Sequence, residues 1–404
     1  AETGWRRGAG FFRACFSSDG GQVSPESAHR ASWRMPALSS ATVYLSANPN
    51  GIGTPKEQDR VAFSQGSFTF GFRKAPNPAS PCVPSFILSD GTSTIRAVAG
   101  AESIDGLSVA WDRAYRTPDA ASPLSPILAD PGMIIEWPRS AWRRADREVF
   151  SWDRFPSVLI FDTADYATQD RYFKRLAFFV EKKGWRGKLW SDAEIAGEHA
   201  YYAHDYRAES LAEFFTRAAE EKFPLGKEEL ELRDILVAEG VIAKNGKGFA
   251  AGAGAIVSIS RESVSYLRYL FMAHECYHGI YFVDPEFRAK VAEVYGSMDP
   301  RALEFLQSYF TIIPSLGYDT SDEYLMENEF MAYLMQQPLD RVGQYFAGNI
   351  AERFRKHGGD PELDGWVVST EAAEFARAAS ELNAYAFGRW GLAGGRVGLF
   401  WSDK

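Results

Sequence analysis

The feature that most constrains the fold of this 404-residue chain is a change of pattern near residue 155. Before it, short stretches that alternate apolar and polar residues, such as ATVYLSA and SFTFGFRK, are separated by turns rich in Gly, Ser and Pro. Alternation with a period of two is typical of half-buried strands. The sequence therefore predicts that residues 1–155 form an all-β module, either a sandwich or a partial barrel.

Beyond residue 155 the apolar residues recur mainly at helical spacing. SVLIFD (157–162) is predicted to be a buried strand. Residues 170–184 are predicted to form a helix that ends in Gly, and the sequence pattern remains mostly helical to about residue 240. We expect a middle α/β region over 156–250. A strand at AIVSIS (255–260) then opens a mainly helical region over 251–404, with helices expected at 262–282, 286–297, 300–313, 321–337, 340–357 and 370–386. The predicted fold class is thus α+β and multidomain.

Composition narrows the class of protein. A net charge of −9 argues against a nucleic-acid partner, because phosphate binding needs a positive surface. No apolar run approaches the roughly 20 residues that a transmembrane helix needs. Three cysteines are too few for a disulfide framework. The chain begins at Ala1 without an initiator Met, so we expect a secreted, periplasmic or cell-surface protein.

One segment, YLFMAHECYHGIYF (269–282), carries two histidines in apolar surroundings. On a helix, His274 and His278 lie about 40° apart and could reach a single ion. Buried imidazoles need polar partners, and a shared metal would satisfy one nitrogen of each. Glu275 lies about 100° from His274, where it could reach a water on that metal. Four apolar residues share the histidine face: Leu267, Leu270, Phe271 and Tyr281.

The five residues HECYH resemble the His-Glu-x-x-His pattern of the zincin metallopeptidases. The resemblance implies that His274 and His278 bind Zn²⁺. Zinc with three protein ligands lowers the pKa of its water to about 7, and the resemblance implies that Glu275 takes the proton as general base. A pair of buried structural histidines is the alternative.

Such a site needs a third protein ligand. Asp284 stands six residues after His278, where metzincins place theirs, but Tyr281 occupies the position at which those families need Gly. The helix expected at 321–337 offers Glu327 and Glu329 in an apolar run, with Thr320 and Glu323 as its capping box. Positions two apart point about 200° away from each other, so only one of the two glutamates fits, and helix phase does not choose between them.

A second resemblance bears on this choice. NEFMA (328–332) is similar to the Asn-Glu-x-x-Ala element of gluzincins such as the thermolysin-like enzymes and the aminopeptidases. It implies that Glu329 is the third ligand, with Glu327 as the reserve candidate or as a partner for a histidine nitrogen. The two resemblances together cover residues 254–338.

The resemblance also implies a substrate side, with a peptide or protein, glycoproteins included, as the substrate. In zincins the strand before the metal helix usually forms an exposed edge that receives an extended peptide, and AGAGAIVSIS holds that position, with Gly252 and Gly254 allowing close approach. Candidate donors to the developing oxyanion are Tyr333, Tyr318 and His204, the last from the polar segment EHAYYAHDYRAE.

We therefore expect a zinc metallopeptidase. Two rivals stay open at this stage. One is a binding or adhesion protein whose zincin domain is inactive or structural, although a structural histidine pair would not need Glu275. The other is a zinc hydrolase that acts on a substrate other than a peptide.

Overall fold

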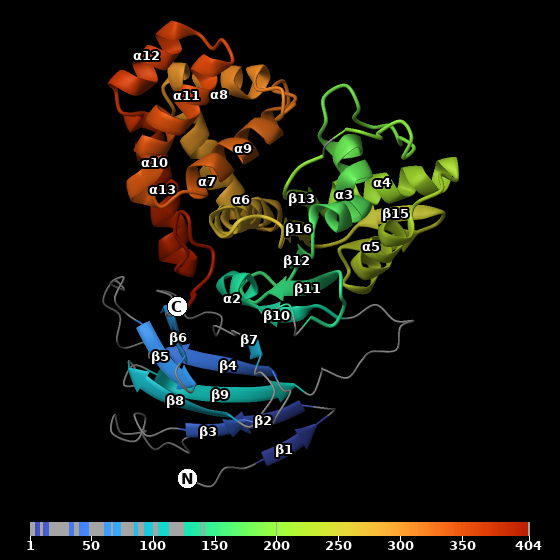
Figure 1. The fold of residues 1–404 in the computed structure, drawn as a ribbon, viewed down its shortest axis with the longest axis vertical. Coiled ribbons are helices and arrows are strands. Elements are labelled where there is room, and N and C mark those ends of the chain that lie inside the picture. Colours follow the sequence, from blue (N-terminus) through green and yellow to red (C-terminus); the bar gives the residue numbers. More distant parts are fainter. Residues whose placement is uncertain are drawn as a thin grey trace. The chain divides into compact units, whose positions relative to one another are not determined.

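The computed structural model describes residues 125–402 except 138, 140, 141 and 199. In the first 124 residues it describes the backbone of nine strands. Helices and strands are mixed along the chain, so the fold is of the α+β class (Figure 1). The chain divides into two compact units. The first unit holds residues 1–156, 386–392 and 398–404, and the second holds residues 157–385 and 393–397.

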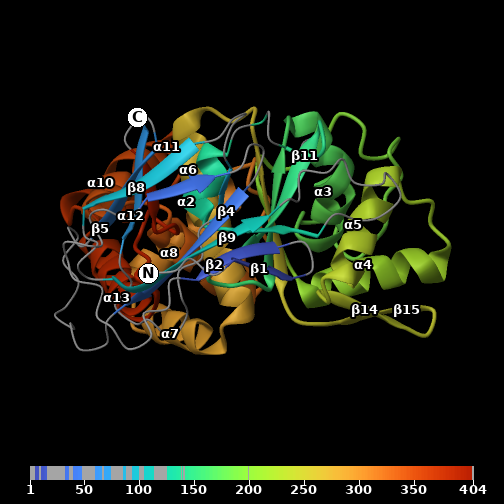
Figure 2. The same cartoon turned by 90° about the horizontal axis from the view of Figure 1, so that it is seen from below.

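The strands at the beginning of the first unit form two five-stranded antiparallel sheets. The first sheet, part of which is visible in Figure 2, has the order β1 (Trp5–Gly8), β2 (Phe11–Cys15), β9 (Ile104–Asp112), β4 (Ser40–Ala47) and β7 (Ser85–Ile87). The second has the order β17 (Phe400–Ser402), β6 (Phe68–Arg73), β5 (Arg60–Gln65), β8 (Ser93–Ala99) and β3 (Ser32–Met35). The C-terminal strand therefore belongs with the N-terminal strands.

The first unit ends with a different arrangement. Strands β10 (Ile127–Ala129) and β11 (Arg147–Trp152) pair in parallel, with helix α2 (Pro131–Glu136) between them in sequence. The Asp130 carboxylate caps α2 by accepting from Gly132 N, and it also accepts from Leu399 N. This carboxylate ties the C-terminal segment to the start of the helix.

The second unit contains a short mixed sheet. Strand β12 (Val158–Thr163) pairs in parallel with β16 (Ala255–Ser260), and β13 (His204–Arg207) pairs antiparallel with β16. Every residue of β12 and β16 is buried, which fits their mainly apolar sequences. Between these strands the chain forms α3 (Tyr166–Val180), α4 (Ala208–Glu221), α5 (Lys227–Ala238) and the hairpin β14 (Ile242–Asn245) and β15 (Gly248–Ala251). The domain boundary expected near residue 250 falls inside this unit.

The expectation that AIVSIS forms an exposed edge is wrong. Strand β16 has a neighbour on each side, and β13 is the edge. The preceding glycines serve contacts within the chain: a Cβ on Gly252 would clash with Gly240 O, and one on Gly254, where φ is +128°, would clash with Ser157 O. Backbone already occupies the space that we expected to admit a substrate.

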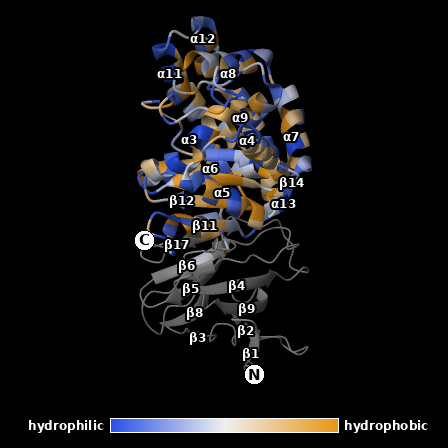
Figure 3. Ribbon diagram, turned by 90° about the vertical axis from the view of Figure 1, so that its right-hand side faces the viewer, coloured by the Kyte–Doolittle hydropathy of each residue, from blue (hydrophilic) through white to orange (hydrophobic). Residues whose placement is uncertain are grey.

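The rest of the second unit is helical. Hydrophobic residues, orange in Figure 3, are frequent along α6 and α9. The helices are α6 (Ser265–Val283), α7 (Pro285–Gly296), α8 (Pro300–Ile312), α9 (Glu323–Met335), α12 (Pro361–Ser369) and α13 (Ala373–Trp390). The last five residues of α13 belong to the first unit. The single helix expected at 340–357 is instead η3 (Leu339–Arg341), α10 (Val342–Gln344), the π-helix η4 (Tyr345–Ile350) and α11 (Ala351–Lys356). No helix in the described part of the chain has the length and apolarity of a membrane span.

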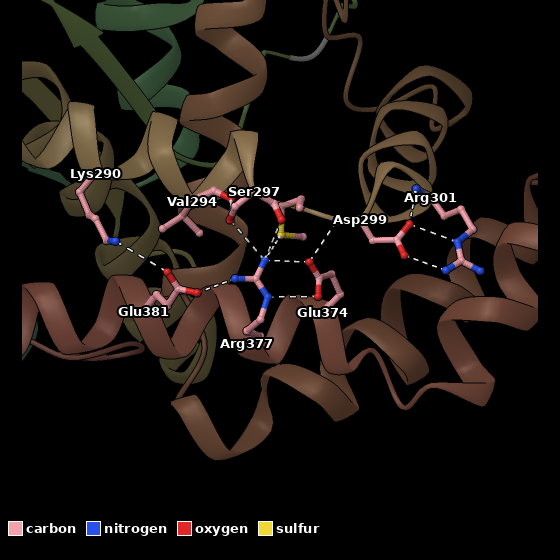
Figure 4. A network of polar contacts seen from close by, with 9 residues as sticks. Lys290, Val294, Ser297, Asp299, Arg301, Glu374, Arg377 and Glu381 are labelled. Atoms are coloured by element: carbon pink, nitrogen blue, oxygen red, sulfur yellow. Dashed lines mark hydrogen bonds and ion pairs between the residues drawn. The ribbon is translucent and has the colours of Figure 1, made fainter.

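Aspartates begin several of these helices. Asp322 caps α9 by accepting from Leu325 N, so the expected capping box of Thr320 and Glu323 is wrong. A polar network holds the start of α13 near α7 and α8 (Figure 4). Arg377 pairs with Glu374 and Glu381, and Glu374 also accepts from Asp299 N at the start of α8.

Candidate metal centre

A buried ion-pair group positions helix α6, which carries the two histidines. The carboxylate of Asp162, at the end of β12, is fully buried and accepts from Arg268 Nη1 at 2.9 Å and from Arg261 Nε at 2.7 Å. Arg268 lies in the second turn of α6. Further along the helix, Gly279 faces Val158 so closely that a Cβ would lie 2.9 Å from its Cγ1. The sheet therefore fixes both the start and the middle of α6, and with them the direction of the histidines.

Donor atoms of three residues meet where α6 packs against α9. His274 Nε2 and His278 Nε2 lie 3.1 Å apart. His274 Nε2 lies 3.7 Å from Glu329 Oε2, and His278 Nε2 lies 3.7 Å from Glu329 Oε1. Ligands about 2.0–2.1 Å from a tetrahedral zinc lie roughly 3.3 Å from one another. These three residues could therefore hold such an ion with little movement.

The hydrogen bonds around His274 favour a metal-binding tautomer. His274 Nδ1 lies 3.2 Å from Gln336 Oε1, while Gln336 Nε2 donates to Tyr333 O and to Tyr345 Oη. Because a backbone carbonyl only accepts, Gln336 Oε1 must face the imidazole, and His274 Nδ1 must carry the proton. The lone pair is then on Nε2, toward Glu329. His278 Nδ1 has no hydrogen-bond partner in the described residues, and its ring stacks on Phe282.

The other candidate ligands lie elsewhere. Glu327 accepts from Tyr281 Oη at 3.1 Å and is not part of the group of donor atoms around the histidines. Asp284 caps α7, where it accepts from Phe287 N at 2.8 Å. Of the three carboxylates considered from the sequence, only Glu329 reaches the histidines.

Glu275 lies beside this group and meets a carboxylate that the sequence did not single out. Glu275, His278 and Asp205 each contribute one donor atom to a group in which all three atoms lie within 4.8 Å of one another. Asp205 comes from the edge strand β13, and Asp205 Oδ1 is 3.9 Å from His278 Nε2. Glu181, at the C-cap of α3, lines the same cavity. The centre thus contains four carboxylates: Glu181, Asp205, Glu275 and Glu329.

Electrostatics at the centre favour a bound cation. Burial raises the pKa of all four carboxyls, and repulsion between neighbours adds to the effect for Glu181, Glu275 and Glu329, the last reaching a pKa of about 7. Burial and the nearby His278 lower the pKa of His274 well below its usual range. In the described residues no Lys or Arg forms an ion pair with these four carboxylates, and Glu275 Oε2 and Glu329 Oε2 have no hydrogen-bond partner. A divalent cation would supply both the missing charge and a partner.

The expected oxyanion donors lie in different places. Tyr333 lines the cavity with its ring centroid 5.5 Å from that of His274, and Tyr318 lines it beside Glu329. The prediction for His204 is wrong, because its ring is buried against Phe173 and its Nδ1 pairs with Tyr206 Oη at 3.0 Å. Alternation along β13 explains the difference. The strand turns His204 toward the core and presents the next residue, Asp205, to the cavity.

A cavity of about 380 Å³ lies over these residues and is large enough for a small ligand. Its acidic end holds Glu181, Asp205, Glu275 and Glu329. The rest of its wall is largely aromatic. Six aromatic side chains contribute: Tyr201, Tyr202, Phe271, Tyr318, Tyr333 and Tyr345.

Comparisons with known proteins give no further indication of what this centre does: no protein-family model, no curated protein and no solved structure matches the chain.

Proposed function

We propose that the chain is a zinc-dependent peptidase that hydrolyses peptide bonds, with its catalytic centre in the second unit. The observation that carries the proposal is the meeting of His274, His278 and Glu329, whose ring nitrogens and carboxylate oxygens lie 3.1–3.7 Å apart, beside the buried Glu275. His274 and His278 stand in HECYH, which resembles the zincin motif, and Glu329 stands in the gluzincin-like NEFMA element. Zinc bound there would polarise the substrate carbonyl and acidify a water molecule.

Each residue has a role that follows from its position. Glu275 would take a proton from the attacking water and pass it to the leaving amine. A raised pKa suits this exchange, because such a carboxyl accepts and releases a proton closer to neutral pH. Gln336 fixes the tautomer of His274. Tyr333 and Tyr318 stand on the wall where a donor could reach the developing oxyanion.

The edge strand β13 is the element best placed to align an extended substrate. Its outer side has no strand partner in the described part of the second unit. Main-chain hydrogen bonds to such an edge could hold a peptide with its scissile bond near the metal. Because Asp205 stands in this strand, a peptide bound there would lie close to the acidic end of the cavity.

The test is a comparison of metal content and cleavage among matched variants. The purified chain should carry about one zinc per molecule and should cleave members of an unbiased peptide library. Glu275→Gln should retain zinc and lose about 10²–10⁴-fold in rate, as expected for removal of an acid–base catalyst. Glu329→Ala should lose zinc. Glu327→Ala, two residues away, is the control and should retain both.

Two results would overturn the proposal. One is a wild-type protein that binds no stoichiometric zinc when zinc is supplied. The other is unchanged cleavage by Glu275→Gln, which would show that the activity does not use this carboxylate. Zinc binding with hydrolysis of esters or sugars in place of peptides would keep the metal centre and replace the substrate class.

A further inference from the structure

The cavity that holds the acidic cluster is also lined by one cationic side chain, Arg353. Of the described residues that line the cavity, it is the only Lys or Arg. It lies in α11, and its guanidinium donates from Nη1 to Tyr309 Oη at 3.2 Å and from Nη2 to Ser315 Oγ at 2.7 Å. These two bonds orient the guanidinium, and its other N–H groups form no hydrogen bond with the described residues.

Arg353 differs from the other cations of its helix. Arg355 pairs with Asp364 and Lys356 pairs with Glu352. In the part of the chain that the structure describes, no carboxylate lies within ion-pair distance of Arg353. An arginine is suited to recognise a carboxylate through two parallel hydrogen bonds, and such charge-assisted bonds are stronger than neutral ones. A partner from outside the chain would complete this interaction.

The π-helix η4 explains how Arg353 comes to face the cavity. Tyr345, the first residue of η4, also lines the cavity and accepts from Gln336 Nε2. Arg353 follows Tyr345 by eight residues. In a regular α-helix this separation corresponds to two full turns and about 80° more around the axis. A π-turn accommodates one extra residue and sets the phase back by about 100°, so Tyr345 and Arg353 end within about 20° of each other. π-Turns of this kind are frequent at functional sites.

We propose that this site takes substrates that present a carboxylate to Arg353 while the scissile carbonyl lies at the centre formed by His274, His278 and Glu329. This inference rests on the proposed peptidase function and specifies its substrate class. The carboxylate is either the C-terminus of a short peptide or an acidic side chain. The aromatic side chains that line the cavity would contact the apolar part of that residue.

The first arm of the test measures binding without catalysis. Metal-free protein is titrated with 3-phenylpropanoate and with 3-phenylpropanamide in a calorimeter, so that the carboxylate cannot bind zinc instead. The acid should bind at least about tenfold more tightly than the amide, since a hydrogen bond to a charged group is stronger than one to a neutral group. Arg353→Met should remove the difference and Arg353→Lys should restore part of it. Arg341→Met, which removes an exposed charge from the same segment, should not change it.

The second arm uses peptides with the zinc-loaded protein. One pair differs only in a C-terminal carboxylate or carboxamide, and a second pair, amidated at the C-terminus, differs only in Glu or Gln next to the scissile bond. Discrimination of about tenfold or more in kcat/KM within the first pair identifies the C-terminus, and within the second pair an acidic side chain. In either case Arg353→Met should abolish the preference, and Arg341→Met should retain it.

The two arms separate the two proposals. If no peptide is cleaved, the peptidase function fails, and the calorimetry still decides on Arg353. If wild-type protein binds acid and amide alike, or binds neither, the carboxylate role is wrong. The same conclusion follows if Arg353→Met retains the wild-type preference for the acid.

Discussion

The second unit contains two sets of buried carboxylates, which differ in whether an arginine or lysine of the chain pairs with them. Asp162 is fully buried and accepts hydrogen bonds from Arg261 and Arg268. Glu275 and Glu329 are each only 5% exposed, and in the described residues neither pairs with a Lys or Arg. Burying a charge is costly unless it is paired or binds a metal. The charge of Asp162 is thus balanced within the chain, whereas the cluster around Glu275 would be balanced by the zinc proposed above.

The first prediction removes the complete group. Asp162→Ala leaves Arg268 buried without its partner, and the loss of one member of a buried ion pair typically costs about 3–5 kcal/mol. Urea unfolding should show a decrease of this size in the free energy of unfolding. Glu228→Ala, which breaks the exposed pair with Arg171, is the control and should cost less than about 1 kcal/mol. Equal effects of the two variants would contradict the comparison.

The second prediction supplies the missing cation. Zinc that binds only the folded state stabilises it by roughly 4 kcal/mol at a thousandfold excess over its Kd. We expect the thermal midpoint of the metal-free protein to rise on addition of zinc, and this rise to be absent in Glu329→Ala. Glu327→Ala should respond like the wild type. A rise in Glu329→Ala equal to that of the wild type would exclude Glu329 as a ligand.

The third prediction concerns pH in the metal-free protein. Burial raises the pKa of Glu329 from 4.5 to about 7 in the folded state, so the folded protein keeps a proton that the unfolded chain releases. This contribution to stability is present below pH 4.5 and is lost as the pH rises toward 7, by on the order of 2–3 kcal/mol. Glu329→Gln should weaken this dependence. An identical slope in both proteins over this range would contradict the assignment.

The fourth prediction tests how the sheet positions α6, the helix that carries the two histidines. In Gly279→Ala the new methyl group would lie 2.9 Å from Val158 Cγ1, and overpacking of a buried contact costs typically about 1–3 kcal/mol. Zinc affinity should fall as well, since Gly279 follows His278 directly. Gly296→Ala is the matched control, because no atom of the described residues outside its own helix and its chain neighbours lies within 4 Å of the added Cβ. Chemical denaturation and zinc titration of both variants measure the effect.

The smallest effect is expected at the glutamate that does not reach the histidines. Glu327→Gln keeps an acceptor for Tyr281 Oη at a half-buried position. It should change the free energy of unfolding by less than about 1 kcal/mol and leave zinc content unchanged. A loss of zinc in this variant would reverse the assignment of the two glutamates.

Part of the candidate centre follows from local sequence alone. The spacing of His274 and His278 places both on one helix face, because helix geometry depends only on neighbouring residues. The helix itself spans Ser265–Val283, close to the expected 262–282. The edge strand was placed wrongly at AIVSIS, because the pattern of apolar residues in a strand does not reveal whether one or both of its sides are paired.

Other parts depend on contacts between distant segments. Glu327 and Glu329 are equivalent on a helical wheel, and only the packing of α9 against α6 brings Glu329 to the histidines. Asp205 was within a segment noted for its polar residues, but strand alternation places it in the cavity in place of His204. Arg353 could not be assigned from the sequence, since a regular helix over 340–357 gives it the wrong phase relative to Tyr345.

The sequence by itself determined the helix that carries HECYH, the two candidate glutamates and the α+β character of the chain, because hydrophobic periodicity and short motifs are local properties. Only the tertiary structure decided which glutamate faces the histidines, which strand forms the edge and which charges surround Glu275. Those charges belong to Glu181, Asp205 and Glu329, which are far from Glu275 and from one another in sequence. Their proximity arises from the packing of α3, β13, α6 and α9, which no local pattern encodes.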